Sequence, residues 1–86
     1  MIQFKICQNG FQVVDEDGKD IKVKKDIYNG FGSYLDAIAK KYPKHDAYIQ
    51  EHRDSLIEAA AYVTHLVEGI KAGQIPKELE GKFIKL

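Results

Sequence analysis

Residues 15 to 20 of the chain read DEDGKD, so four carboxylates surround one glycine. Such a cluster could bind Ca²⁺, which takes about six to eight oxygen ligands. In the helix-loop-helix calcium motif the glycine stands sixth in the loop, and the first and twelfth positions also supply ligands. With Gly18 in the sixth position, those two positions fall on Val13 and Lys24, and neither side chain can ligate a cation. We therefore expect a solvated turn and not a metal site.

The histidines and the single cysteine are the other residues that could carry chemistry. His45, His52 and His65 are separated by seven and thirteen residues, whereas zinc-binding histidines of a helix stand about three or four apart. Cys7 falls in a predicted strand, away from the helix starts that favour reactive thiolates. Residues 29–32 read NGFG and lack the third glycine and the lysine of a phosphate-binding loop. The sequence predicts no catalytic residue, no metal and no cofactor.

Lysines on one predicted strand face could contact phosphate groups. These are Lys5, Lys22 and Lys24. However, Arg53 is the only arginine among thirteen cations, and arginine has the planar fork that reads guanine. A small nucleic-acid-associated regulator that uses this lysine face is therefore the alternative function.

A stripe of residues on a predicted long helix could bind a protein. It consists of Tyr48, Ser55, Tyr62 and His65. Tyrosine is enriched at interface hot spots because it offers a large rigid area with a polar tip. Packing of the two tyrosines against the shorter predicted helix is the other interpretation.

Composition limits the classes of function. The 86 residues fit one domain, and the apolar and charged fractions of 44% and 30% are ordinary for a globular protein. Thirteen basic and thirteen acidic side chains cancel, which argues against a DNA mimic and against a general polyanion binder. With one cysteine, no signal-peptide pattern at residues 1–10 and no long apolar segment, we expect a cytoplasmic protein without membrane contact.

The first half of the chain predicts an antiparallel β-meander over residues 1–28. Asn9-Gly10 is the preferred dipeptide of a two-residue hairpin turn and would pair Ile6 with Val13. A three-residue loop at residues 16–18 would then place Asp15 opposite Lys19, and pair Val13 with Ile21 and Phe11 with Val23. Alternation places the larger apolar residues on one face, namely Phe4, Ile6, Phe11, Val13 and Ile21. The other face, which includes Lys5, Cys7, Gln12 and Val14, is expected to be mostly solvated.

The second half predicts two helices and a tail. A short helix over residues 33–42 would begin at Ser33 as N-cap, with Asp36 three residues on, and would stop at Pro43. A long helix over residues 46–72 would begin at Asp46 and end at Gly73. Its aliphatic residues recur every seven positions, at Ile49, Leu56, Val63 and Ile70. The tail over residues 73–86 contains a helical turn opened by Pro76, and residues 83–86 could add a strand.

The long helix would be too long for the sheet. A continuous rod over residues 46–72 measures about 40 Å, whereas strands of six or seven residues measure about 20–23 Å. Half of the aliphatic stripe would then need another cover. The short helix and the tail are internal candidates, and a second copy of the chain, in a homodimer, is the external one.

The expected fold is therefore α+β, with a three-stranded antiparallel meander packed on a short and a long helix, and with the option of a fourth, carboxyl-terminal strand. The expected function is that of a small non-catalytic protein-binding module that docks onto another protein or onto itself. Small size and the lack of catalytic equipment suggest an accessory protein of a phage or mobile element that inhibits a host protein complex.

Overall fold

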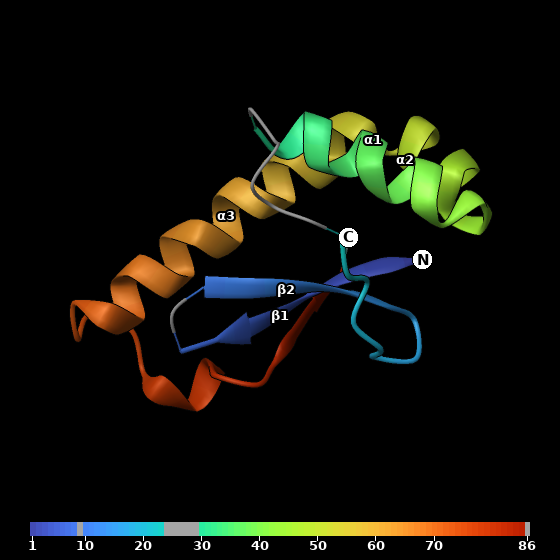
Figure 1. Cartoon of the computed structure of the whole chain (residues 1–86). Helices are drawn as coiled ribbons and strands as arrows, with labels where there is room; N and C mark the ends of the chain where they lie inside the picture. Colours follow the sequence, from blue (N-terminus) through green and yellow to red (C-terminus); the bar gives the residue numbers. More distant parts are fainter. Residues whose placement is uncertain (9, 24–29, 86) are drawn as a thin grey trace.

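The computed structural model describes residues 1–8, 10–23 and 30–85, and it has the α+β fold that the sequence predicts (Figure 1). The elements follow in the order β1 (Ile2–Cys7), β2 (Gly10–Asp15), α1 (Phe31–Lys41), the 3₁₀ turn η1 (Pro43–His45), α2 (Asp46–Glu51), α3 (Arg53–Lys71), the 3₁₀ turn η2 (Lys77–Leu79) and β3 (Phe83–Lys85). No helix in this described part of the chain combines the length and hydrophobicity needed to cross a membrane.

The sheet has the strand order β2-β1-β3, and both pairs of neighbours are antiparallel. The predicted register of the first hairpin is wrong, because Ile6 pairs with Phe11 and Phe4 with Val13. The two-residue shift keeps every side chain on its predicted face, since side chains alternate with a period of two. Ile2, Phe4 and Ile6 are fully buried on the face that packs against the helices.

The carboxyl-terminal segment supplies the third strand of the sheet. Ile84 pairs with Phe4, and the main chain of Ile6 extends the pairing through hydrogen bonds with Gly81 and Lys82 of 2.8 and 2.9 Å. The helical turn after Pro76 is also present. Residues 83–85 therefore close the sheet beside β1, at the edge opposite β2, while Leu86 lies outside the described residues.

The predicted third strand of the meander is present only as an isolated bridge between Val14 and Asp20. Its register is the predicted one, since the amide of Ile21 donates to the carbonyl of Val13 at 2.9 Å. The expected pairing of Phe11 with Val23 is wrong, because the chain leaves β2 after Ile21. The chain departs where Lys41 and Tyr42, at the end of α1, donate hydrogen bonds to the carbonyl of Lys22.

The carboxylate-rich loop is a turn, as predicted. The amide of Asp15 donates to the carbonyl of Lys19 at 2.9 Å, which places these residues opposite each other. The Asp15 carboxylate accepts the amides of Asp17 and Lys19, both at 2.9 Å, and Gly18 supplies the positive φ of 82°. These hydrogen bonds, chiefly that from Lys19, lower the pKa of Asp15.

The second face of the sheet is less solvated than predicted, because Val14 and Gln3 are buried there. Phe83 lies on this face by register, and its ring comes within 3.5 Å of the position that a Cβ of Gly18 would occupy. The carboxyl-terminal strand and the carboxylate-rich turn therefore meet on this face. Alternation alone could not predict this cover, since it comes from two distant segments.

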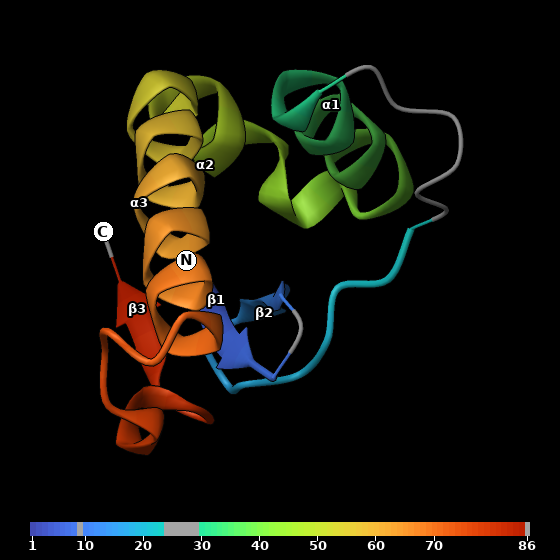
Figure 2. The same ribbon diagram turned by 90° about the vertical axis from the view of Figure 1, so that its left-hand side faces the viewer.

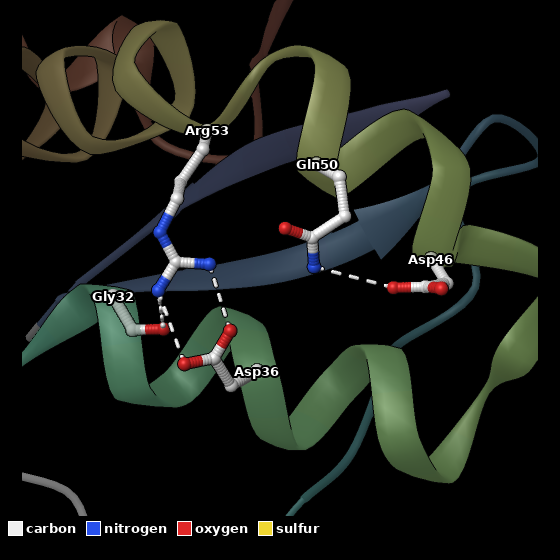
Figure 3. Close-up of polar contacts among 5 residues, drawn as sticks. All are labelled: Gly32, Asp36, Asp46, Gln50 and Arg53. Atoms are coloured by element: carbon white, nitrogen blue, oxygen red, sulfur yellow. Dashed lines mark hydrogen bonds and ion pairs between the residues drawn. The ribbon is translucent and has the colours of Figure 1, made fainter.

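Helix α1 begins earlier than predicted, and Ser33 is not its N-cap. The N-cap is Gly30, and Ser33 lies in the first turn. Asp36 does not close a capping box, because both of its carboxylate oxygens accept hydrogen bonds from Arg53, at 2.7 and 3.0 Å (Figure 3). The helix ends at Lys41, and Pro43 follows directly after its C-cap, as expected.

The predicted rod over residues 46–72 is wrong as a single helix, because it is divided at His52. The residue has φ −113° and ψ 21°, outside the helical range, and separates α2 from α3. No proline or glycine causes the division. The break lets α2 turn back onto α1 (Figure 2). Ile49 of α2 and Leu56 of α3 are both fully buried. Tertiary packing overrides local helix propensity here.

Helix α3 is covered at both ends within one chain. Its carboxyl-terminal half packs on the sheet, whereas its beginning packs against α1 and α2 (Figures 1 and 2). Arg53 fixes this second contact, since it also donates to the Gly32 carbonyl of α1 at 3.2 Å. Leu56, Val63 and Ile70 are buried. The overhang that argued for a homodimer is therefore filled by the internal candidate, the short helix.

The end of α3 follows the predicted stop at Gly73. The amide of Gly73 donates to Ile70 at 3.1 Å, and the amide of Gln74 donates to Gly69 at 2.8 Å. These are the two hydrogen bonds of a Schellman motif, with Gly73 at φ 74°. Ile75 then folds back onto the helix, where a Cβ on Gly69 would lie 2.4 Å from its terminal carbon and 2.7 Å from its Cγ1.

We expect Gly69→Ala to destabilise the protein by about 1–2 kcal/mol, because overpacking at Ile75 outweighs the higher helix propensity of alanine. Urea denaturation measures this change, with Gly10→Ala as the control, since a Cβ on Gly10 meets no atom within 4 Å. Adding Ile75→Ala should make the double variant more stable than the sum of the two single effects. A Gly69→Ala protein as stable as the Gly10→Ala protein would contradict the packing.

Candidate protein-binding groove

A groove of about 500 Å³ lies where β2, α1 and α3 meet. Each element contributes one wall. The wall from β2 is Gly10, Phe11 and Val13, the wall from α1 and its N-cap is Gly30, Phe31 and Tyr34, and the wall from α3 is Thr64, Val67, Glu68 and Lys71. The volume falls within the range of about 300–1,000 Å³ that is typical of ligand sites.

Aromatic rings form the apolar part of the groove. The ring centre of Phe31 lies 6.1 Å from that of Phe11 and 5.6 Å from that of Tyr34. Both phenylalanines also contact the fully buried Phe4, at 5.5 and 5.8 Å. These separations are typical of favourable aromatic pairs. The rings are therefore anchored to the core on one side and partly open to solvent on the other.

The α3 wall carries three polar side chains, those of Thr64, Glu68 and Lys71. The hydroxyl of Thr64 donates to the carbonyl of Ala60 at 2.8 Å, so its hydrogen is already used. Glu68 and Lys71 are both exposed and place one charge of each sign beside the groove. An apolar centre with a mixed polar rim is the pattern of a protein interface.

A second hollow, of about 280 Å³, continues from the groove along β2. It shares Val13 and Tyr34 with the groove and is otherwise lined by Gln12 and the segment 20–23. It marks the fork where that segment leaves β2. At the fork the carbonyl of Lys22 accepts hydrogen bonds from two residues at the end of α1, Lys41 Nζ at 2.8 Å and Tyr42 hydroxyl at 3.3 Å.

The structure divides the residues of the predicted partner-binding stripe. Ser55, Tyr62 and His65 are exposed along the outer side of α3, and the Tyr62 side chain is 58% exposed. Tyr48 stands apart on α2, where it packs against the core and its ring lies 4.5 Å from that of His52. The interface role of these residues stays a prediction.

The predicted phosphate-contacting lysines lie in different settings. Lys5 is half-buried between Gln12 and Phe83 in the sheet, whereas Lys22 is exposed at the fork. Lys24 lies outside the described residues. Asp20 stands next to Lys22 along the fork, so the charge there is mixed.

Cys7 and His45, two of the remaining chemical candidates, lie toward opposite ends of the hairpin. Cys7 lies at the hairpin end of β1, and its thiol contacts the carbonyl of Lys5 at 3.6 Å. His45 is buried near Asp15 and Glu16, which belong to the opposite end of the hairpin. Within the described residues, no group of three or more His, Cys, Asp or Glu side chains could hold a metal ion.

His45 is the one histidine that the fold buries. Burial lowers its pKa, and the positive charges of Lys44 and of the amino terminus lower it further. Asp15 and Glu16 act in the opposite direction. The folded protein therefore favours neutral His45.

Sequence reasoning missed the groove, although it assigned some of its residues. The apolar pattern placed Phe11 and Val13 on the face where they lie, but it predicted no hollow beside them. The signal that could have pointed to the groove is the pair of aromatic residues near the start of α1, Phe31 and Tyr34. The helix already buries Leu35 and Ile38, whereas the two aromatic side chains are only partly buried.

We expect acid to destabilise the fold through His45. As the pH falls, the unfolded chain binds a proton at a pKa of about 6.5, before the folded chain does. The stabilising contribution of neutral His45 is therefore present above about pH 6.5 and is lost as the pH falls below that value. The urea midpoint should be lower at about pH 5 than at about pH 7.5.

His45→Gln should reduce this difference, and His65→Gln, at an exposed position, should leave it unchanged. The lowered pKa values of Asp15 and Asp36 affect stability only in a more acidic range, since their ordinary value is 3.8. Equal midpoints at the two pH values in the unmodified protein would contradict the assignment to His45.

Comparison with known proteins adds no family to this geometry. No family model, no curated protein and no solved structure matches the chain. What the groove can bind therefore follows from its own walls, rim and neighbouring strand.

Proposed function

We propose that the chain is a small non-catalytic protein-binding module and that a partner protein inserts an apolar side chain into the groove between β2, α1 and α3. The observation that carries this proposal is the groove itself, with Phe11, Phe31 and Tyr34 as its aromatic walls. Burial of one large apolar side chain contributes about 1.5–3 kcal/mol, enough for such a contact to act as an interface anchor.

The mixed charges beside the groove favour a protein partner over a free polyanion. Glu68 and Lys71 carry opposite charges, and Thr64 adds a neutral polar side chain to the same wall of the groove. Interfaces between proteins commonly combine an apolar centre with polar groups of both signs at the rim. A polyanion, in contrast, would require a surplus of positive charge at its site.

The biological setting in this proposal is the one expected from the sequence. The module is cytoplasmic and acts as an accessory protein of a phage or mobile element that inhibits a host protein complex by docking onto it. Inhibition by a shaped surface suits a chain whose thirteen basic and thirteen acidic residues cancel. A homodimer remains a separate prediction, which light scattering of the purified chain tests.

We expect Thr64→Arg to weaken partner binding at least about tenfold, because the long charged side chain would occupy the groove. His65→Arg is the matched control, since the same side chain is placed on the next residue of α3, which does not line the groove. Both positions are exposed, so both variants should keep the thermal stability of the unmodified protein. The measurement is quantitative capture from an extract of the source cells, followed by titration of the captured protein.

Two outcomes would contradict the groove. Loss of binding in His65→Arg but not in Thr64→Arg would assign the interface to the stripe of Ser55, Tyr62 and His65. Micromolar binding to random duplex DNA with a steep dependence on salt would favour the nucleic-acid alternative.

A further inference from the structure

The outer edge of β2 carries main-chain groups that point away from the sheet. The amide of Asp15 and the carbonyl of Val13 bond outward, to Lys19 and Ile21. Successive residues of a strand direct their main-chain groups to opposite sides, so the amide and carbonyl of Phe11 also point outward. On the other side of the hairpin Ile6 bonds toward the carboxyl-terminal segment, which is consistent with this alternation.

No residue that the structure describes fills the edge position beside Phe11. The bridge to β2 ends with Ile21, and the next carbonyl, that of Lys22, is held by Lys41 and Tyr42. The predicted partner of Phe11, Val23, instead lines the hollow at the fork. A strand edge of this kind, whose main-chain groups are paired by no residue in the described ranges, is a template for another extended chain.

The open edge borders both hollows. Phe11 and Val13 direct their side chains to the helix-covered face of the sheet, and both line the groove. A strand added at this edge would direct alternate side chains to the same face, about 6.5–7 Å apart. Its side chains i and i+2 would then reach the groove at Phe31 and the hollow at Tyr34 in turn.

We propose that the protein partner contributes an extended segment that adds as a strand to the edge of β2 at Phe11, with apolar side chains at two alternate positions in the groove and the adjoining hollow. This inference rests on the proposed protein-binding function and specifies how the partner docks. Main-chain hydrogen bonds supply part of the affinity in such strand addition, and the pockets for alternate side chains supply the specificity.

The charges around the edge define the rest of the segment. Asp20 and Lys22 stand at the fork, and Glu68 and Lys71 stand beside the groove. Because each end presents both signs, we expect neutral or singly charged residues between the apolar positions. The partner segment is therefore apolar at alternate positions and polar between them.

The test uses synthetic heptapeptides, acetylated and amidated, with Val, Ile, Leu, Phe or Tyr at alternate positions and Ser, Thr or Lys between them. Nuclear magnetic resonance titration of the ¹⁵N-labelled chain should show members of this set that shift the amides of Phe11, Phe31 and Thr64 together. Hydrogen exchange at the Phe11 amide should slow at least about tenfold, because that amide gains a hydrogen-bond acceptor. Peptides with aspartate at the alternate positions should not bind.

Methylation of single peptide amides separates strand addition from simple insertion of a side chain. Blocking the amide that donates to the Phe11 carbonyl should weaken binding about tenfold, whereas methylation of a neighbouring amide that points away should have a smaller effect. On the protein side, Phe11→Pro should bind more weakly than Phe11→Ala. Both variants lack the ring, but only proline also lacks the outward amide.

The outcomes separate this inference from the proposed function. Peptides that bind in the groove with no sensitivity to amide methylation would overturn strand addition and leave the protein-binding function standing. A complete absence of binding up to millimolar peptide would also overturn strand addition. The proposed function is judged separately, by capture of the intact partner with Thr64→Arg and His65→Arg. The methylation series does not depend on whether the Phe11 variants fold.

Discussion

The length of α3 relative to the sheet is the constraint on which the rest of this structure depends. Its nineteen residues extend about 28 Å, whereas a six-residue strand extends about 20 Å. The aliphatic stripe of α3 must therefore be covered by two different parts of the fold. The sheet covers Val63 to Ile70, and α1 with α2 covers the stripe around Leu56. The break at His52 makes the second cover possible, because it returns α2 to α1.

The groove is a consequence of that double cover. The sheet and α1 meet α3 at different positions along its length (Figure 2). The groove lies where the three elements converge, with Phe11 and Phe31 on two of its walls. The rings of Phe11 and Phe31 both contact Phe4, which holds the two walls together. The guanidinium of Arg53 holds α1 against the start of α3 through its hydrogen bonds to Asp36 and Gly32. Walls fixed in this way would lose little conformational entropy if the proposed partner bound there.

Local chemistry made part of this fold predictable. The loop at residues 16–18, the stop at Gly73 and the face of Phe4 each follow from a short segment of sequence, and each is present. The hairpin register was not predictable from the apolar pattern, because a shift by two residues leaves every face unchanged. The break at His52 and the groove depend on contacts between distant segments. The sequence pointed instead to the stripe of Tyr48, Ser55, Tyr62 and His65, because the periodicity of one predicted helix is enough to define such a stripe.

The end of the predicted third meander strand, at residues 20–23, shows how a contact with a distant segment shapes the candidate site. Strand propensity does not stop the pairing, since Val23 is a good strand residue and the register through Ile21 would place it opposite Phe11. The chain departs where Lys41 and Tyr42, nineteen and twenty residues further on, take the Lys22 carbonyl. Both belong to the end of α1, whose other end forms a wall of the groove. The edge beside Phe11, which no described residue pairs, and the groove therefore both adjoin the same helix.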